Sequence, residues 1–87
     1  MWNSGRKSGT IKKVYDMTRG IVLISMENEE GTFNVFWKKN RFNFDCLPNS
    51  YVMIRGRLTY IKIKMAMSQN PKKIIAIEAR SIERYDV

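Results

Sequence analysis

Apolar and polar residues alternate in five segments of this chain, and a period of two predicts β-strands with one buried face. The five segments are residues 10–15, 21–26, 32–38, 51–67 and 72–82. The fourth carries Gly56 on its apolar face, and a glycine inside a strand often marks a bend or a bulge. The pattern therefore predicts an all-β fold of five strands.

The connections between the segments predict how the sheet closes. Residues 27–31 are acidic and polar and end in glycine, which is typical of a hairpin turn. Residues 39–50 hold three asparagines and a proline beside Phe42 and Phe44, and predict a short helix or a loop that caps the sheet. Five strands in an open sheet would leave unpaired edges, whereas closure removes them. We therefore expect a closed barrel.

With 87 residues, the chain has room for one domain. Residues 1–8 are mostly polar, with two basic groups and Trp2 as the large apolar side chain, and predict a flexible basic N-terminal arm. Residues 9–87 then form the single domain. No apolar run approaches the roughly 20 residues of a membrane span, and none follows the N-terminus as in a signal peptide. These features favour a cytoplasmic protein.

Three stretches of the sequence resemble strands of a known barrel family. Residues 20–28 are a glycine, alternating apolar residues and a charged turn, and residues 31–36 carry a polar Asn34 between apolar neighbours. Residues 50–58 follow the pattern hydrophobic-x-hydrophobic-x-Gly-x-hydrophobic. Over roughly residues 9 to 84 the chain is similar to OB-folds of the exodeoxyribonuclease VII large-subunit and tRNA-anticodon type, and to small single-stranded-DNA-binding proteins.

This resemblance implies a five-stranded Greek-key OB-fold barrel with a short helix or loop between strands three and four. It also implies binding of single-stranded nucleic acid. The binding surface would be the faces of strands two and three and the loops that join strands one to two and four to five.

The charge of the chain agrees with a polyanionic partner. Sixteen Lys and Arg residues stand against eight Asp and Glu residues, which gives a net charge of +8. Nucleic acid is the commonest polyanion that such a small basic domain binds. A membrane surface fits less well, because no basic amphipathic helix is visible. A basic protein that is merely soluble is the plain alternative.

The sequence offers little for catalysis. It has no histidine and a single cysteine, Cys46, and so lacks Ser/His/Asp and Cys/His nucleophilic sites and the usual zinc ligand sets. It also lacks glycine-rich phosphate and dinucleotide motifs. We therefore expect a non-catalytic protein with no cofactor and no metal.

Single-strand binding needs cations that follow the phosphates and flat side chains that accept bases. Phe36 is the best stacking candidate, because Asn34 and Lys38 share its strand face and are polar. Burial in a second layer, under the N-terminal arm or a partner, is the alternative. Lys62 and Lys64 alternate with isoleucines in a predicted hairpin, where lysines also guard strand edges. The predicted nucleic-acid-binding residues are Lys12, Lys13, Asn34, Phe36, Lys38, Lys39, Arg41, Arg55, Arg57, Tyr60, Lys62 and Lys64.

The leading hypothesis is a single-stranded DNA-binding protein of replication, recombination or repair, with RNA as the alternative ligand. A second hypothesis is a small accessory subunit that binds a larger replication enzyme, such as a polymerase, primase or helicase. The alternation turns several large apolar side chains outward, and contiguous apolar patches usually mark binding surfaces. The predicted partner-binding residues are Trp2, Leu23, Met65 and Met67. Homo-oligomerisation would cover the same area.

Overall fold

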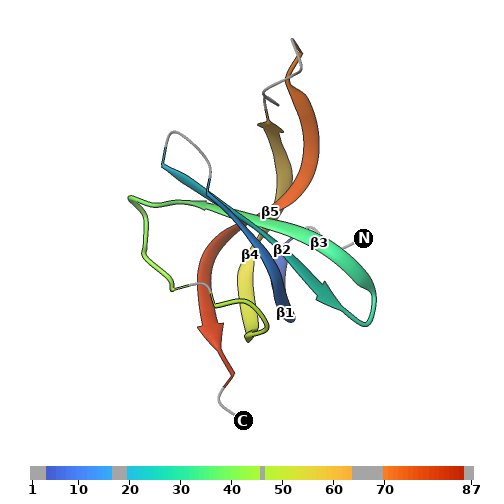
Figure 1. The fold of residues 1–87 in the computed structure, drawn as a ribbon, viewed down its shortest axis with the longest axis vertical. Coiled ribbons are helices and arrows are strands. Elements are labelled where there is room, and N and C mark those ends of the chain that lie inside the picture. The colour runs from blue at the N-terminus through green and yellow to red at the C-terminus, as the bar shows by residue number, and fades with distance from the viewer. Residues whose placement is uncertain (1–3, 17–19, 46, 64–69, 86–87) are drawn as a thin grey trace.

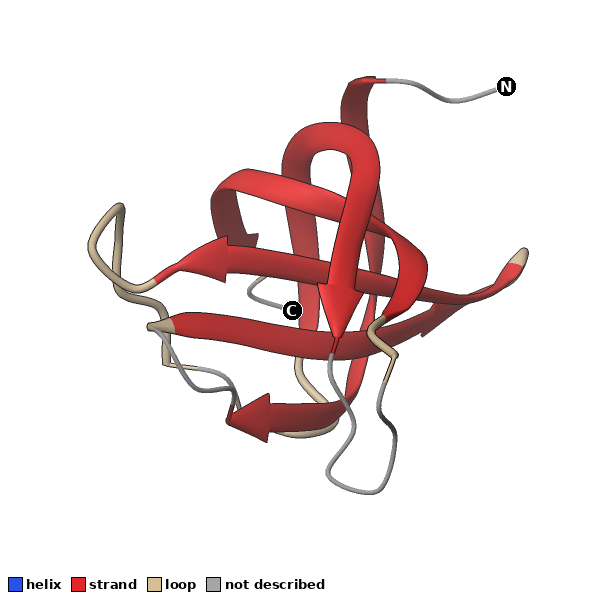
Figure 2. Ribbon diagram, turned by 90° about the horizontal axis from the view of Figure 1, so that it is seen from above, coloured by secondary structure: helices blue, strands red, loops and turns tan. Residues whose placement is uncertain are grey.

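The computed structural model describes residues 4–16, 20–45, 47–63 and 70–85, and it is built from strands (Figure 1). The strands are β1 (Ser4–Asp16), β2 (Ile21–Asn28), β3 (Gly31–Lys38), β4 (Tyr51–Ile63) and β5 (Lys72–Arg84). Figure 2 shows these strands joined by loops and turns, with no helix in the described ranges. The predicted all-β class with five strands is confirmed, and the connection after β3 is a loop where it is described.

The five strands form a closed barrel in the order β1-β2-β3-β5-β4. Strand β1 pairs with two strands: residues 10–16 pair with β2, and residues 4–10 pair with β4. Strand β4 thus lies beside β1 in a sheet that continues through β2 and β3, which is the Greek-key order. The barrel closes where β5 meets β3 in parallel, at Val35 and Ile77. The predicted closed Greek-key barrel is therefore confirmed.

The predicted N-terminal arm is wrong for residues 4–8, which belong to β1. Their backbone pairs with β4 from Ser4 opposite Arg57 to Ser8 opposite Met53. The sequence pattern did not indicate this strand, because backbone pairing places it in the sheet and its side chains show no apolar alternation. Gly5, with φ at 130°, lies opposite Gly56, so the two strands meet here without side chains. Residues 1–3 lie outside the described residues.

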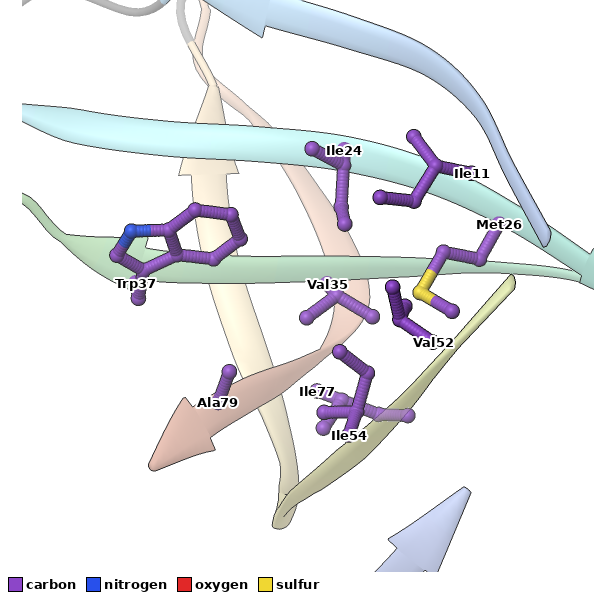
Figure 3. Close-up of a cluster of buried hydrophobic side chains, with 9 residues drawn as sticks. All are labelled: Ile11, Ile24, Met26, Val35, Trp37, Val52, Ile54, Ile77 and Ala79. Carbon is purple, nitrogen blue, oxygen red and sulfur yellow. The ribbon is translucent and has the colours of Figure 1, made fainter. Parts of the chain in front are cut away.

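The barrel interior is filled by side chains from every strand (Figure 3). Trp37 is 2% exposed and belongs to this inner cluster, as its position in the alternation predicts. Phe42 and Phe44 from the loop after β3 pack against the inner cluster, and the Phe42 ring stacks on Trp37 with centroids 5.5 Å apart. The loop therefore caps the barrel. The inner cluster consists of Ile11, Ile24, Met26, Val35, Trp37, Val52, Ile54, Ile77 and Ala79.

Two β-bulges interrupt the barrel, and the extra residue in each is a cation. In β5 the partner changes from Ser81, opposite Arg55, to Ala79, opposite Gly56, so Arg80 is left over. In β1 the pairing passes from Ile11 directly to Lys13, so Lys12 is left over. A bulge bends the strand and re-aims the extra side chain. The bend predicted at Gly56 is confirmed, and the extra residue lies on the neighbouring strand.

The second half of β4 and the first half of β5 extend beyond the barrel as a hairpin. Within the described residues, β1 pairs with β4 only as far as Arg57, so residues 58–63 pair with β5 alone. Figure 1 shows this part projecting past β2 and β3, on the side away from the C-terminus. No helix in the described part of the chain is long and apolar enough to cross a membrane.

Candidate nucleic-acid interface

The outer face of the barrel can be read from the strand register. Partners across a ladder share a face, so residues opposite one another lie in rows that cross the sheet. One row joins Lys13, Ser25 and Asn34 on β1, β2 and β3. The next row crosses the whole barrel through Tyr15, Leu23, Phe36, Glu78 and Arg57. Both rows alternate with inner-cluster residues and therefore face outward.

The centre of this outer face is covered by the hairpin of the same chain. Leu23 and Phe36 are 5% and 7% exposed, and they form an outer cluster with Ile61 of β4 and Ala76 of β5. Ile21 and Ile74 pack at the edge of this cluster. The hairpin is therefore packed against the centre of the outer face of β1–β3.

This packing corrects two predictions about individual residues. Phe36 is not an open stacking platform, because the outer cluster buries its ring. The alternative of a second buried layer is right about the burial, but the hairpin, and not the N-terminal segment or a partner, covers the ring. Leu23 is not free to contact a partner protein, because Ile61 and Ala76 occupy that position. Alternation along a strand sets the face on which a side chain lies, but it does not say what covers that face.

Tyr15 is the exposed aromatic ring on this face. It lies opposite Leu23 in the second row, and 38% of its surface is exposed. The Nζ atom of Lys13 lies 4.9 Å from the centre of the Tyr15 ring, within the range of a cation–π contact. The bulge at Lys12 shifts the alternation of β1, which is why the sequence pattern did not place Tyr15 on this face.

Predicted cations lie at both ends of the second row. Lys13 is exposed beside Tyr15, and Arg57 is exposed at the opposite end, where its Nε atom lies 3.8 Å from Oε1 of Glu78. Lys38, two residues beyond Phe36, is exposed on the same face opposite Ile21. Asn34 is half-buried between them and the β2–β3 turn. The structure thus brings Lys13, Asn34 and Lys38 to the outer face of β1–β3, whereas Arg57 lies on β4, beyond β5 around the barrel.

A second group of cations lies where the loop leaves β3. The amide of Lys39 donates a hydrogen bond to the carbonyl of Gly20, which holds the start of the loop against β2. Lys38 and Arg41 line a cleft with Arg80 of β5. Arg80 was missed by the sequence analysis, because only the closure of β5 onto β3 brings it to this place. The one signal in the sequence was the alternation of β5, which places Arg80 on the same face as Glu78.

Other predicted residues lie away from this face. Tyr60 and Lys62 pair with Ile75 and Lys73, and they alternate with Ile61, so they point to the opposite side of the hairpin. Tyr60 is 59% exposed, with the Nζ atom of Lys73 over its ring at 4.2 Å. Lys12 is exposed on its bulge, and Arg55 is exposed on β4 opposite Ser81.

Some predicted residues lie outside the described ones. Lys64 of the nucleic-acid set belongs to this group. So do three members of the partner-binding set, Trp2, Met65 and Met67. Of the predicted partner-binding residues, only Leu23 can therefore be placed.

Acidic side chains gather at the other end of the sheet. Glu27, Glu29 and Glu30 lie at or beside the β2–β3 turn, where Oε2 of Glu30 is 3.7 Å from the Nζ atom of Lys7. The remaining acids whose side chains are described are Asp45, Glu78 and Glu83. Among the acids whose side chains are described, half therefore lie at this turn, and Glu78 is the one that shares a cleft with Lys38 and Arg80.

A comparison of the sequence with protein-family models finds no matching family, and a comparison with curated proteins finds no similar protein. The OB-fold resemblance therefore stays a prediction at the level of the family. The residues of the outer face are the basis on which a function can be argued.

Proposed function

We propose that this protein binds single-stranded nucleic acid, DNA before RNA, along the outer face of β1–β3 and without catalysing a reaction. The observation that carries the proposal is the exposed Tyr15 ring on this face, with the Nζ atom of Lys13 4.9 Å from its centre and Lys38 exposed on the same face. The resemblance to single-stranded-DNA-binding OB-folds supports the same ligand. Replication, recombination and repair are the processes in which such a protein would act.

The chemistry of this face suits an unpaired strand. Tyr15 can accept the face of a base, and stacking of one base on a ring is worth about 1–3 kcal/mol. Lys13 and Lys38 stand at the two ends of the β1–β3 surface and can follow the phosphates. A duplex would keep its bases stacked inside, and the ring would find no partner. The exposed ring therefore favours a single strand.

Fluorescence anisotropy with labelled oligo-dT tests this proposal. We expect micromolar or tighter binding at low salt, which weakens steeply as salt rises because counterions are released from the strand. Replacing the ring by Tyr15→Ala should weaken binding by about 1–3 kcal/mol. Tyr85→Ala is the matched control, because Tyr85 is 46% exposed and packs against Tyr51 at the start of β4. Equal loss in both variants, or no binding at low salt, would contradict the proposal.

The accessory-subunit hypothesis is favoured by a different observation. Tyr60 and Ile75 are cross-strand partners on the far side of the hairpin, and they are 59% and 56% exposed. An exposed aromatic and aliphatic pair is typical of a protein contact. Failure to bind oligo-dT at low salt, with partner binding abolished in Ile75→Lys, would favour this second function.

A further inference from the structure

A cleft of about 400 Å³ lies beside the outer face, between the end of β3, the loop that follows and the bulge of β5. Three cations line it, one from each of these elements: Lys38, Arg41 and Arg80. We propose that this cleft is a subsite for a phosphoryl group. The inference rests on the proposed function, because the bound strand is the nearest source of phosphate, but the cleft can be tested without nucleic acid.

The three cations are available to a ligand. Among the described residues, no carboxylate lies within salt-bridge distance of Lys38, Arg41 or Arg80. The one acid that lines the cleft is Glu78, and its Oε1 atom faces Arg57, 3.8 Å away. Three like charges converge here, and a phosphoryl group supplies the negative charge that would relieve their repulsion.

The bulge explains why Arg80 lines the cleft. Arg80 is the extra residue between Ala79, which pairs with Gly56, and Ser81, which pairs with Arg55. The extra residue is free of ladder pairing, so its side chain can turn toward β3 and the loop. Gly56 makes this arrangement possible, because a Cβ atom there would lie 2.1 Å from the carbonyl oxygen of Glu78.

The apolar lining of the cleft strengthens its attraction for an anion. Trp37 and Phe42 stack with an interplanar angle of 16°, and Ala79 lies beside them. Trp37 is 2% exposed and belongs to the inner cluster, so the stacked pair is anchored in the barrel. Charges beside an apolar wall interact more strongly than charges in bulk water. Arginine also presents a planar fork of donors that matches phosphate oxygens.

Phosphoryl groups have three sources that the same chemistry would accept. The group could come from inside a bound strand, from the end of a strand, or from a small free phosphate such as pyrophosphate. Because Lys38 lies on the outer face and also lines the cleft, a strand bound along β1–β3 would reach it. We therefore expect the bound strand to supply the phosphate.

The direct test uses Trp37 as a reporter. The chain has two tryptophans, so the variant Trp2→Phe leaves Trp37 as the sole source of tryptophan fluorescence. In this background, pyrophosphate should change the emission of Trp37 in a saturable manner. Arg80→Gln should weaken the pyrophosphate affinity by about tenfold, because it removes a charged hydrogen bond. Arg6→Gln is the matched control, since Arg6 is an exposed arginine of β1 that lines a separate hollow near Glu27 and Glu29.

A second variant changes the charge of the cleft in the opposite sense. Glu78→Gln removes the one carboxylate among the described residues of the lining and should strengthen pyrophosphate binding by about two- to threefold. Arg80 is exposed, and Glu78 is half-buried at the surface. A thermal melt of each variant verifies that the fold is retained. Opposite effects of Arg80→Gln and Glu78→Gln would mark an electrostatic site at this cleft.

Oligonucleotides then identify the source of the phosphate. If Arg80→Gln weakens oligo-dT with and without a 5′ or 3′ terminal phosphate equally, the cleft binds the strand interior. A loss confined to oligonucleotides with a terminal phosphate assigns the cleft to a strand end. Pyrophosphate binding without oligo-dT binding would support the cleft and contradict the proposed function. Oligo-dT binding with no effect of Arg80→Gln on either ligand would overturn the subsite and leave the proposed function standing.

Discussion

Two apolar clusters lie on opposite faces of one sheet, and they have different structural roles. The inner cluster takes residues from all five strands, and most of its members have no exposed surface. The outer cluster has four members, Leu23, Phe36, Ile61 and Ala76, which are 1–8% exposed. The inner cluster closes the barrel, whereas the outer one sets the position of the hairpin over the proposed binding face. The same residue type can therefore stabilise the fold or shape the site.

Ile54 of the inner cluster and Ile61 of the outer cluster both lie on β4. Substituting each of them therefore compares the two clusters within a single strand. Ile54 is fully buried in the inner cluster, so Ile54→Ala should lower the free energy of unfolding by about 4 kcal/mol. Chemical denaturation followed by circular dichroism measures this change. A loss no larger than that of Ile61→Ala would mean that the inner cluster does not dominate stability.

Gly56 lies where the barrel continues into the hairpin, and a substitution there tests this junction. An added Cβ atom would meet the carbonyl oxygen of Glu78, so Gly56→Ala should cost about 3 kcal/mol of unfolding free energy. Gly20→Ala separates crowding from backbone strain, because Gly20 has open space around it and a φ of 70°. We expect about 1 kcal/mol for this control. Similar losses in the two variants would contradict the close approach of β4 to β5.

Ile61→Ala should cost less, about 2 kcal/mol, because Ile61 lies in the smaller cluster and near solvent. Its effect should be local. Hydrogen exchange should accelerate at the amides of residues 58–63 and 72–76, while amides near Val35 and Val52 stay protected. Uniform acceleration through the barrel would show that the two clusters are one cooperative unit.

Charge reversal should affect binding and leave stability nearly unchanged. Lys38 lies on the face of the outer row, whereas Lys62 lies on the opposite side of the hairpin. Lys38→Glu should therefore reduce the slope of log affinity against log salt for oligo-dT, by about 0.7 for each phosphate that the variant no longer neutralises. Lys62→Glu should change the slope less, and each variant should alter unfolding by under about 0.5 kcal/mol. A larger effect at Lys62 would move the strand to the far side of the hairpin.

The fold could be predicted from local signals that the structure bears out. Period-two alternation located the five strands, and the position of Trp37 in that alternation gave its place in the core. The first half of β1 could not be found in this way, because Ser4 to Ser8 are held by backbone pairing and bear no apolar pattern. The extra residues of the bulges, Lys12 and Arg80, also escaped prediction. At Arg80 the inward face passes from Ala79 to Ile82, a step of three where alternation predicts two.

The candidate site was predicted in part. Lys13, Asn34 and Lys38 lie on one face, as cations and polar residues of neighbouring strands should, whereas Arg57 lies further round the barrel on β4. Phe36 was predicted to stack on bases because its neighbours on the same face of β3, Asn34 and Lys38, are polar. Its true surroundings are Ile61 and Ala76, at least twenty-five residues away along the chain. Contacts of that range depend on how β4 and β5 cross the barrel, and no local pattern encodes them.

By itself, the sequence determined the elements and their chemistry: five strands by alternation, a cationic excess by composition, and no histidine for catalysis. Tertiary structure alone decided which face of each strand meets solvent. A hairpin of the same chain covers Phe36, and closure of β5 onto β3 brings Arg80 to Lys38 and Arg41. The physical reason is that alternation reports the two sides of a strand, whereas burial depends on what packs against each side.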